Sequence, residues 1–113
     1  MSIREISAAA ITDAVEALCI EANTKLPADV KAALDQAEAA EPWPLARETL
    51  GLLQQNLVVA ADKELPICQD TGMACVFIEL GQDAHISGDL TDAVDEGVRR
   101  GYETVSYTHL TLP

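Results

Sequence analysis

Residues 65–78 read LPICQDTGMACVFI, and the interpretation of the chain begins from this stretch. Its polar side chains occupy four consecutive positions between apolar flanks. Pro66 biases Leu65 towards extended geometry, and Gly72 permits a turn that a residue with a side chain would resist. Residues Met73 to Leu80 are rich in aliphatic and aromatic residues on both alternating faces, which predicts a strand buried on both sides. We therefore expect a short polar loop at the start of a buried strand, where a rigid element holds several reactive side chains in place.

The length and composition are those of a small globular protein. The chain has 113 residues, of which 49% are hydrophobic and 23% are charged, so it forms one domain at most and is not a disordered tail. Nineteen acidic residues against seven basic residues give a formal net charge of -12. Such a charge repels nucleic acids and anionic membrane surfaces. We therefore expect neither as a partner, and we attribute most of the acidic residues to a solvated surface.

The sequence also carries information about the compartment. The first twenty residues mix acidic with apolar positions and contain no apolar run of signal-peptide length. No segment reaches the ~18 apolar residues of a membrane span. The three cysteines are an odd number in a chain without a secretory signal, which favours free thiols or metal ligands over a disulfide framework. We therefore expect a cytoplasmic protein.

Helical periodicity dominates the part of the chain that precedes the polar loop. Apolar residues recur at helical spacing from Met1 to Asn23, and Cys19 falls on this stripe, where it is expected to be a packing residue. A second helix is predicted to begin at Pro27 and to end at Glu41, because the prolines that follow cannot continue it. A third helix is predicted from Pro44 to about Lys63 and is expected to be largely buried.

The part of the chain after the predicted strand is shorter and more polar. Turn-forming residues from Gly81 to Asp89 surround a short second strand. Asp89 or Thr91 is expected to cap a helix from Asp92 to Gly101, whereas residues 103–113 show no helical periodicity. The predicted fold class is therefore α+β, with three helices, a loop and strand, and a further helix.

Three interpretations of residues 68–72, which read CQDTG, remain open from the residues alone. The first takes Cys68 as a thiolate ligand of an iron-sulfur cluster, with Gln69 and Asp70 beside the substrate and the carboxyl suited to proton transfer. The second takes the DTG triplet as the catalytic turn of an aspartic protease, which the helical pattern disfavours because such proteases are all-β. The third takes Asp70 and Thr71 as turn-capping residues and the cysteines as packing residues, and composition and spacing alone favour it.

A longer pattern changes this balance. The motifs PICQDTGM at 66–73, VFIELGQ at 76–82 and DEGVRRGY at 95–102 together resemble the alpha subunit of class I, iron-sulfur fumarate hydratases and L(+)-tartrate dehydratases. The motifs REI at 4–6 and LPADV at 26–30 fit the opening of the same family. The resemblance covers about residues 3–102 and rests mainly on its first, long motif.

The resemblance implies a hydro-lyase that adds or removes water across a four-carbon dicarboxylate, either fumarate to malate or tartrate to oxaloacetate. In that family three cysteines hold a [4Fe-4S] cluster whose fourth iron acts as a Lewis acid. Cys68 matches the first cluster ligand, Gln69 and Asp70 match substrate-binding residues, and Asp70 is also the candidate catalytic residue. The other two ligands lie beyond residue 113 in the family, so Cys19 and Cys75 are not assigned as ligands. A beta subunit or C-terminal domain of the same enzyme supplies the catalytic base, and the intact enzyme is expected to be an oligomer.

The resemblance ends at Tyr102. Residues 103–113 read ETVSYTHLTLP, whereas the family continues into most of its catalytic domain. We therefore divide the chain into residues 1–102, the N-terminal part of such an alpha subunit, and residues 103–113, a tail that does not match the family and that we expect to be non-native. On this interpretation the chain alone is inactive. The alternative is a non-catalytic helical module that associates with other subunits and in which the CQDTG turn is structural.

Overall fold

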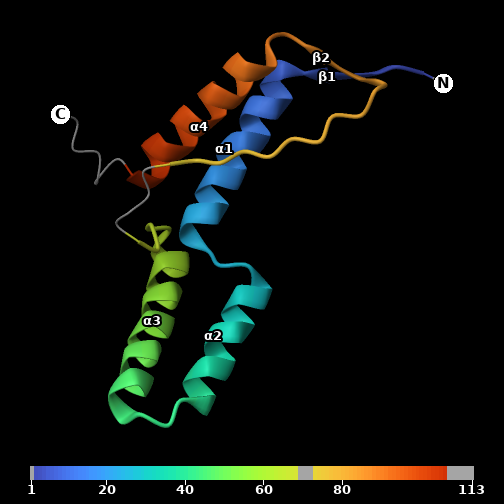
Figure 1. The fold of residues 1–113 in the computed structure, drawn as a ribbon. Helices are drawn as coiled ribbons and strands as arrows, with labels where there is room; N and C mark the ends of the chain where they lie inside the picture. The colour runs from blue at the N-terminus through green and yellow to red at the C-terminus, as the bar shows by residue number, and fades with distance from the viewer. Residues whose placement is uncertain (1, 69–72, 107–113) are drawn as a thin grey trace.

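The computed structural model describes residues 2–68 and 73–106, and it is mainly helical with one small sheet (Figure 1). This architecture confirms the predicted α+β class. The chain extends over 58 × 40 × 22 Å, and no helix within the described ranges has the length and apolar character needed to cross a membrane. The elements follow the order β1 (Arg4–Ser7), α1 (Ala8–Thr24), α2 (Ala28–Ala40), α3 (Pro44–Lys63), β2 (Ala84–Ser87) and α4 (Leu90–Ser106).

The sheet consists of β1 and β2, which pair in parallel from Arg4 opposite Ala84 to Ser7 opposite Ser87. The short strand predicted between Gly81 and Asp89 is therefore confirmed as β2. The strand β1 corrects the sequence prediction, which places a single helix over residues 1–23. The local reason is Ser7, whose hydroxyl accepts a hydrogen bond from the Ala10 amide at 3.1 Å. This N-cap starts the helix seven residues later than the periodicity suggests and leaves the preceding residues free to pair.

The core lies between α1 and α4, which run side by side (Figure 1). Val15 and Cys19 on α1 are 6% and 8% exposed, so the prediction that Cys19 is a packing residue is confirmed. The helices approach closely at Gly97 and Gly101 of α4, where an added Cβ would lie 2.7 Å from Val15 Cβ and 2.7 Å from Cys19 Cβ, respectively. The buried Thr12 hydroxyl also donates a hydrogen bond to the Ala93 carbonyl across the interface at 2.8 Å.

The helix α4 is longer than the sequence predicts. Asp89 begins it as expected, since its carboxylate accepts a hydrogen bond from the Asp92 amide at 2.9 Å. The helix then continues past Gly101 to Ser106, so the expectation that residues from 103 onwards lack helical structure is wrong for 103–106. The physical reason is tertiary, because Val105 is only 3% exposed, and burial of an aliphatic side chain contributes about 2 kcal/mol.

The helices α2 and α3 form an antiparallel hairpin that projects away from the α1–α4 pair (Figure 1). Both lie close to the predicted bounds, with Pro44 in the first turn of α3. The expectation that α3 is largely buried is wrong, since Ala60 is the buried residue identified on it and its large side chains are half-exposed. A single neighbouring helix can cover only one face of α3, whereas the apolar residues of α3 are distributed over more than one face.

Residues 73–80 cross α1 as an extended segment that belongs to neither strand nor helix (Figure 1). The predicted strand, buried on both sides, is therefore not observed. Met73 is 83% exposed and Phe77 is 94% exposed. The β-forming composition is present, but a strand also requires a neighbour for its backbone ladder, and within 2–68 and 73–106 the sheet contains only β1 and β2.

Candidate functional site

The residue before Cys68 is held from two sides. The Ile67 amide donates a hydrogen bond to the Asn23 carbonyl near the end of α1 at 2.8 Å. The Asn56 side-chain amide of α3 donates to the Ile67 carbonyl, also at 2.8 Å. Because the backbone N–H and C=O of Ile67 are held by two different helices, the position from which Cys68 projects is set by α1 and α3 together.

The chain reaches this anchor through a tight helix end. Glu64 adopts a left-handed conformation with φ of 52°, and the Leu65 amide donates to the Ala60 carbonyl at 3.0 Å. Such a C-cap turns the chain sharply out of the helix. The chain therefore leaves α3 four residues before Cys68, the first residue of the polar loop.

Cys68 lies at the surface and is exposed. The other proposed site residues, Gln69 and Asp70, lie outside the described residues, as do Thr71 and Gly72. Within 2–68 and 73–106 no set of three or more histidine, cysteine or acidic side chains is arranged to hold a metal ion. The described part of the chain thus offers one exposed thiol at an anchored position.

A cavity of about 360 Å³ lies beside this anchor, between the second half of α1, the C-terminal part of α4 and the start of the extended segment. Asn23, whose carbonyl holds Ile67, contributes to its wall. Burial raises the pKa of the Cys19 thiol in the same wall, which keeps it protonated. The cavity is lined by Val15, Leu18, Cys19, Ala22, Asn23, Met73, Ala74, Cys75, Val76, Phe77 and Tyr102.

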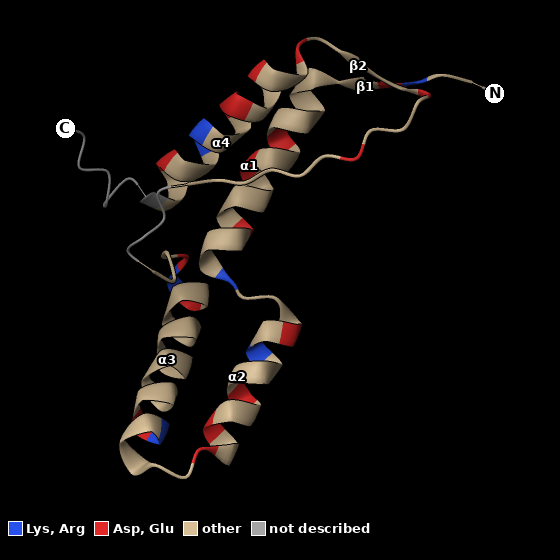
Figure 2. Cartoon of the chain, viewed as in Figure 1, with Lys and Arg blue, Asp and Glu red and all other residues tan. Residues whose placement is uncertain are grey.

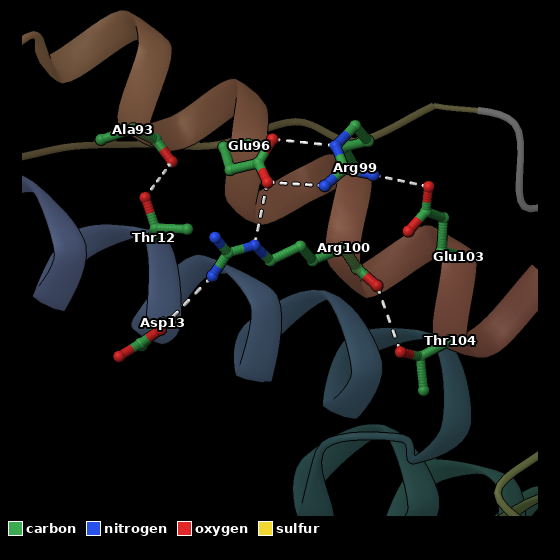
Figure 3. A network of polar contacts seen from close by, with 8 residues as sticks. All are labelled: Thr12, Asp13, Ala93, Glu96, Arg99, Arg100, Glu103 and Thr104. Atoms are coloured by element: carbon green, nitrogen blue, oxygen red, sulfur yellow. Dashed lines mark hydrogen bonds and ion pairs between the residues drawn. The ribbon is translucent and has the colours of Figure 1, made fainter.

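An ion-pair network runs along α4 and reaches α1 (Figure 3). Glu96 receives hydrogen bonds from Arg99 at 2.6 and 2.8 Å and from Arg100 at 2.9 Å. Hydrogen bonds from Arg99 and Arg100 lower the pKa of Glu96 to about 2. Arg99 also pairs with Glu103 at 2.6 Å, and Arg100 reaches Asp13 of α1 at 3.8 Å. The network thus stabilises α4 along its length and connects it to α1.

Neither the anchor nor the network was identified as such from the sequence. The network carried a usable signal, because Glu96, Arg99, Arg100 and Glu103 stand at the three- and four-residue spacings that bring helix side chains together. Asn56 carried a weaker one, since asparagine is a poor helix former in the middle of a helix. Asn23 acts through its backbone carbonyl, and a backbone contact has no sequence signature.

We predict that Asn56→Ala weakens the anchor of Ile67. The loss of one side-chain hydrogen bond costs about 1 kcal/mol, and the better helix propensity of alanine offsets roughly half of this, so the free energy of unfolding is expected to fall only slightly. The substitution should also accelerate hydrogen exchange at the Ile67 amide relative to amides in α4. Urea unfolding and exchange followed by NMR measure the two effects. Gln55→Ala, at the neighbouring exposed position, is the control, and equal exchange at Ile67 in both variants would contradict the prediction.

We predict that Glu96→Gln changes how stability depends on pH. The pKa of Glu96 in the folded chain lies below its ordinary value of 4.5, so its ion pairs stabilise the fold above pH 4.5 and lose this effect as the pH falls towards 2. The variant should therefore have a slightly lower urea midpoint than the parent at pH 7, with the gap closing between pH 4.5 and 2. The effect is small because the pair is solvent-exposed. Glu48→Gln is the control, and a gap independent of pH would refute the assignment.

Comparison with known proteins identifies the family. A family model described as fumarate hydratase (Fumerase) matches residues 12–109, a range that begins within α1 and includes the polar loop and all of α4. A Methanocaldococcus jannaschii protein provisionally named L(+)-tartrate dehydratase subunit alpha is 35% identical over 97 residues, or 84% of this chain. The L(+)-tartrate dehydratase alpha subunits of Escherichia coli K12 and Shigella boydii are each 27% identical over 88 residues, or 78% of this chain. The chain belongs to the fumarate hydratase (Fumerase) family.

The matched region is a minor part of these relatives. It covers 34% of the Methanocaldococcus protein and 29% of the Escherichia coli subunit. The chain therefore spans about a third of the length of the curated relatives it matches. The family match also continues to residue 109, beyond the point where the sequence motifs end.

Proposed function

We propose that this chain contributes Cys68, Gln69 and Asp70 to the active site of an iron-sulfur hydro-lyase that acts on a four-carbon dicarboxylate. Family membership supports the reaction class, since both fumarate hydratases and tartrate dehydratases move water across such a substrate. The observation that carries the proposal is the anchored position of Cys68, which is exposed and follows Ile67, a residue whose backbone N–H and C=O are held by α1 and α3.

The donor chemistry fits an iron-sulfur cluster in part. An exposed thiol on a loop fixed by two helices is the kind of ligand that such a cluster uses. One thiolate is not a complete site, and the described residues supply no group of three ligating side chains. We propose that the remaining ligands come from the other two-thirds of the alpha subunit, which this chain does not match. The chain alone is therefore expected to be inactive.

Each residue has a distinct role in the proposed reaction. When bound, the [4Fe-4S] cluster supplies a Lewis-acidic iron for a substrate oxygen. Cys68 holds its thiolate at a fixed point beside α1 and α3. The Gln69 carboxamide donates a hydrogen bond to a substrate carboxylate, and the Asp70 carboxyl holds or transfers a proton. A beta subunit or C-terminal domain provides the catalytic base, and the enzyme acts as an oligomer in the cytoplasm.

The test is anaerobic reconstitution of the cluster in two proteins. The first is this chain alone, and the second is an extended protein in which the chain is joined to the portion of the Methanocaldococcus relative that follows the matched stretch. We expect cluster absorbance only in the extended protein, and hydration of fumarate or dehydration of tartrate once a beta subunit is added. An extended protein that folds but takes up no iron would favour the non-catalytic association module.

A further inference from the structure

The extended segment 73–80 has two open backbone edges. Within 2–68 and 73–106 it forms no strand pair and none of its peptide groups makes a backbone hydrogen bond. Its sequence, MACVFIEL, is nevertheless rich in residues that favour strands. Unpaired, extended and apolar backbone is a template for pairing with another strand.

The two sides of this segment differ in their surroundings. The inner side lies over α1 and α4 and leaves hollows beneath it, including the cavity of about 360 Å³ and a second of about 300 Å³ that reaches Leu80. Phe77 is nevertheless 94% exposed and Ile78 is 50% exposed, although both contribute to the wall of the second hollow. Glu79 is the single charged residue of the segment, which is otherwise uncharged in Figure 2. The segment therefore lies over α1 and α4 as a single extended chain. Within the described residues, no neighbouring strand pairs with it on either edge.

The exposed area indicates the size of the missing neighbour. The accessible surface of the chain is 8374 Å², whereas a compact monomer of 12.0 kDa exposes roughly 6,000 Å². The excess of roughly 2,400 Å² is larger than the ~800 Å² that each partner buries in an interface of standard size. Part of the exposed surface is apolar, including side chains of segment 73–80 and of α3.

We infer that residues 73–80 are a docking strand, to which a strand from the remaining two-thirds of the family's alpha subunit pairs over α1 and α4. This inference rests on the proposed function for the identity of its partner. The matched relatives carry that remainder, since the chain covers 34% and 29% of their lengths. A second copy of this chain is a poorer partner, because each copy carries a formal net charge of -12 and the two would repel each other.

Hydrogen exchange tests the inference at the segment itself. In the chain alone the amides of 73–80 are expected to exchange at nearly the rate of an unstructured peptide. In the extended protein the same amides are expected to be protected by at least ~100-fold, since paired strand amides exchange through local unfolding. Unprotected amides in a folded extended protein would overturn the inference.

Two variants separate pairing at this segment from general stability. Phe77→Asp is expected to remove the protection without changing the unfolding of the chain alone, because Phe77 is already 94% exposed. Ile3→Asp introduces the same charge at a residue that is 57% exposed and lies outside the segment, and it should keep the protection. Equal loss of protection in both variants would overturn the inference.

Further measurements identify the partner and cover a failure of the fusion to fold. If the chain alone dimerises in sedimentation experiments and protects 73–80 by doing so, a second copy is the partner and the inference is wrong. Co-expression of the chain with the separate remainder provides a second route to a complex, and failure of both routes also overturns it. Cluster absorbance is recorded independently of hydrogen exchange. An extended protein with protected amides at 73–80 but no iron would contradict the proposed function and would still support the docking strand.

Discussion

Replacement of Gly101 by alanine is expected to destabilise the fold by about 2 kcal/mol, in spite of the better helix propensity of alanine. A Cβ at this position would lie 2.7 Å from Cys19 Cβ and 3.1 Å from the Glu16 carbonyl oxygen. Overpacking of a tight interface costs about 1–3 kcal/mol, or more when backbone must move, whereas the gain in propensity is about 1 kcal/mol. Gly97→Ala should behave in the same way, because its Cβ would meet the Thr12 carbonyl oxygen at 2.7 Å.

The chain offers a matched control on another helix. A Cβ at Gly51 of α3 would contact the end of the flexible Glu38 side chain at 3.2 Å, and the side chain can move aside. Gly51→Ala is therefore expected to stabilise the protein by up to about 1 kcal/mol. Urea unfolding followed by circular dichroism measures all three variants. If Gly101→Ala were as stable as Gly51→Ala, α1 and α4 would not pack at the distance described.

Replacement of Cys68 by serine in the extended protein is expected to abolish cluster assembly. A serine oxygen is a poor substitute for thiolate as a ligand of an iron-sulfur cluster, and two cysteines do not complete a site that uses three. The measurement is cluster absorbance and iron content after anaerobic reconstitution. Unfolding in urea should be unchanged, because Cys68 is exposed and its replacement opens no cavity.

Cys75→Ser is the control for this prediction. Cys75 is likewise exposed, and it lies only seven residues further along the chain. Its replacement should leave both the cluster and dicarboxylate turnover unchanged. A cluster that persists without Cys68, or that is lost equally in both variants, would show that the loop does not hold iron in the proposed way.

Local signals in the sequence predicted the elements that depend on local causes. Prolines set the start of α3, and Asp89 capped α4 as expected. These features act within a few residues, so a sequence pattern contains most of the relevant information. The resemblance likewise found the family, because its long motif is contiguous.

The errors concern contacts between distant parts of the chain. The strand β1 exists because Arg4 to Ser7 pair with residues 84–87, and four residues are too few for a periodic pattern. The extension of α4 depends on burial of Val105, and the exposure of α3 and of segment 73–80 depends on neighbours that the described residues do not provide. For the site, Cys68 stays a prediction from the sequence, and its anchor through the Asn23 carbonyl became visible only in the fold.

The parallel pairing of β1 with β2 also sets the order in which the protein can fold on the ribosome. The hairpin of α2 and α3 contains only local contacts, so it can form as soon as its 36 residues, 28–63, have been synthesised. In contrast, β1 and α1 must wait for β2 and α4, about 80 residues later in the chain. At ~5–20 residues per second this delay is roughly 4–16 s. During that time the face of α1 that packs against α4 is uncovered.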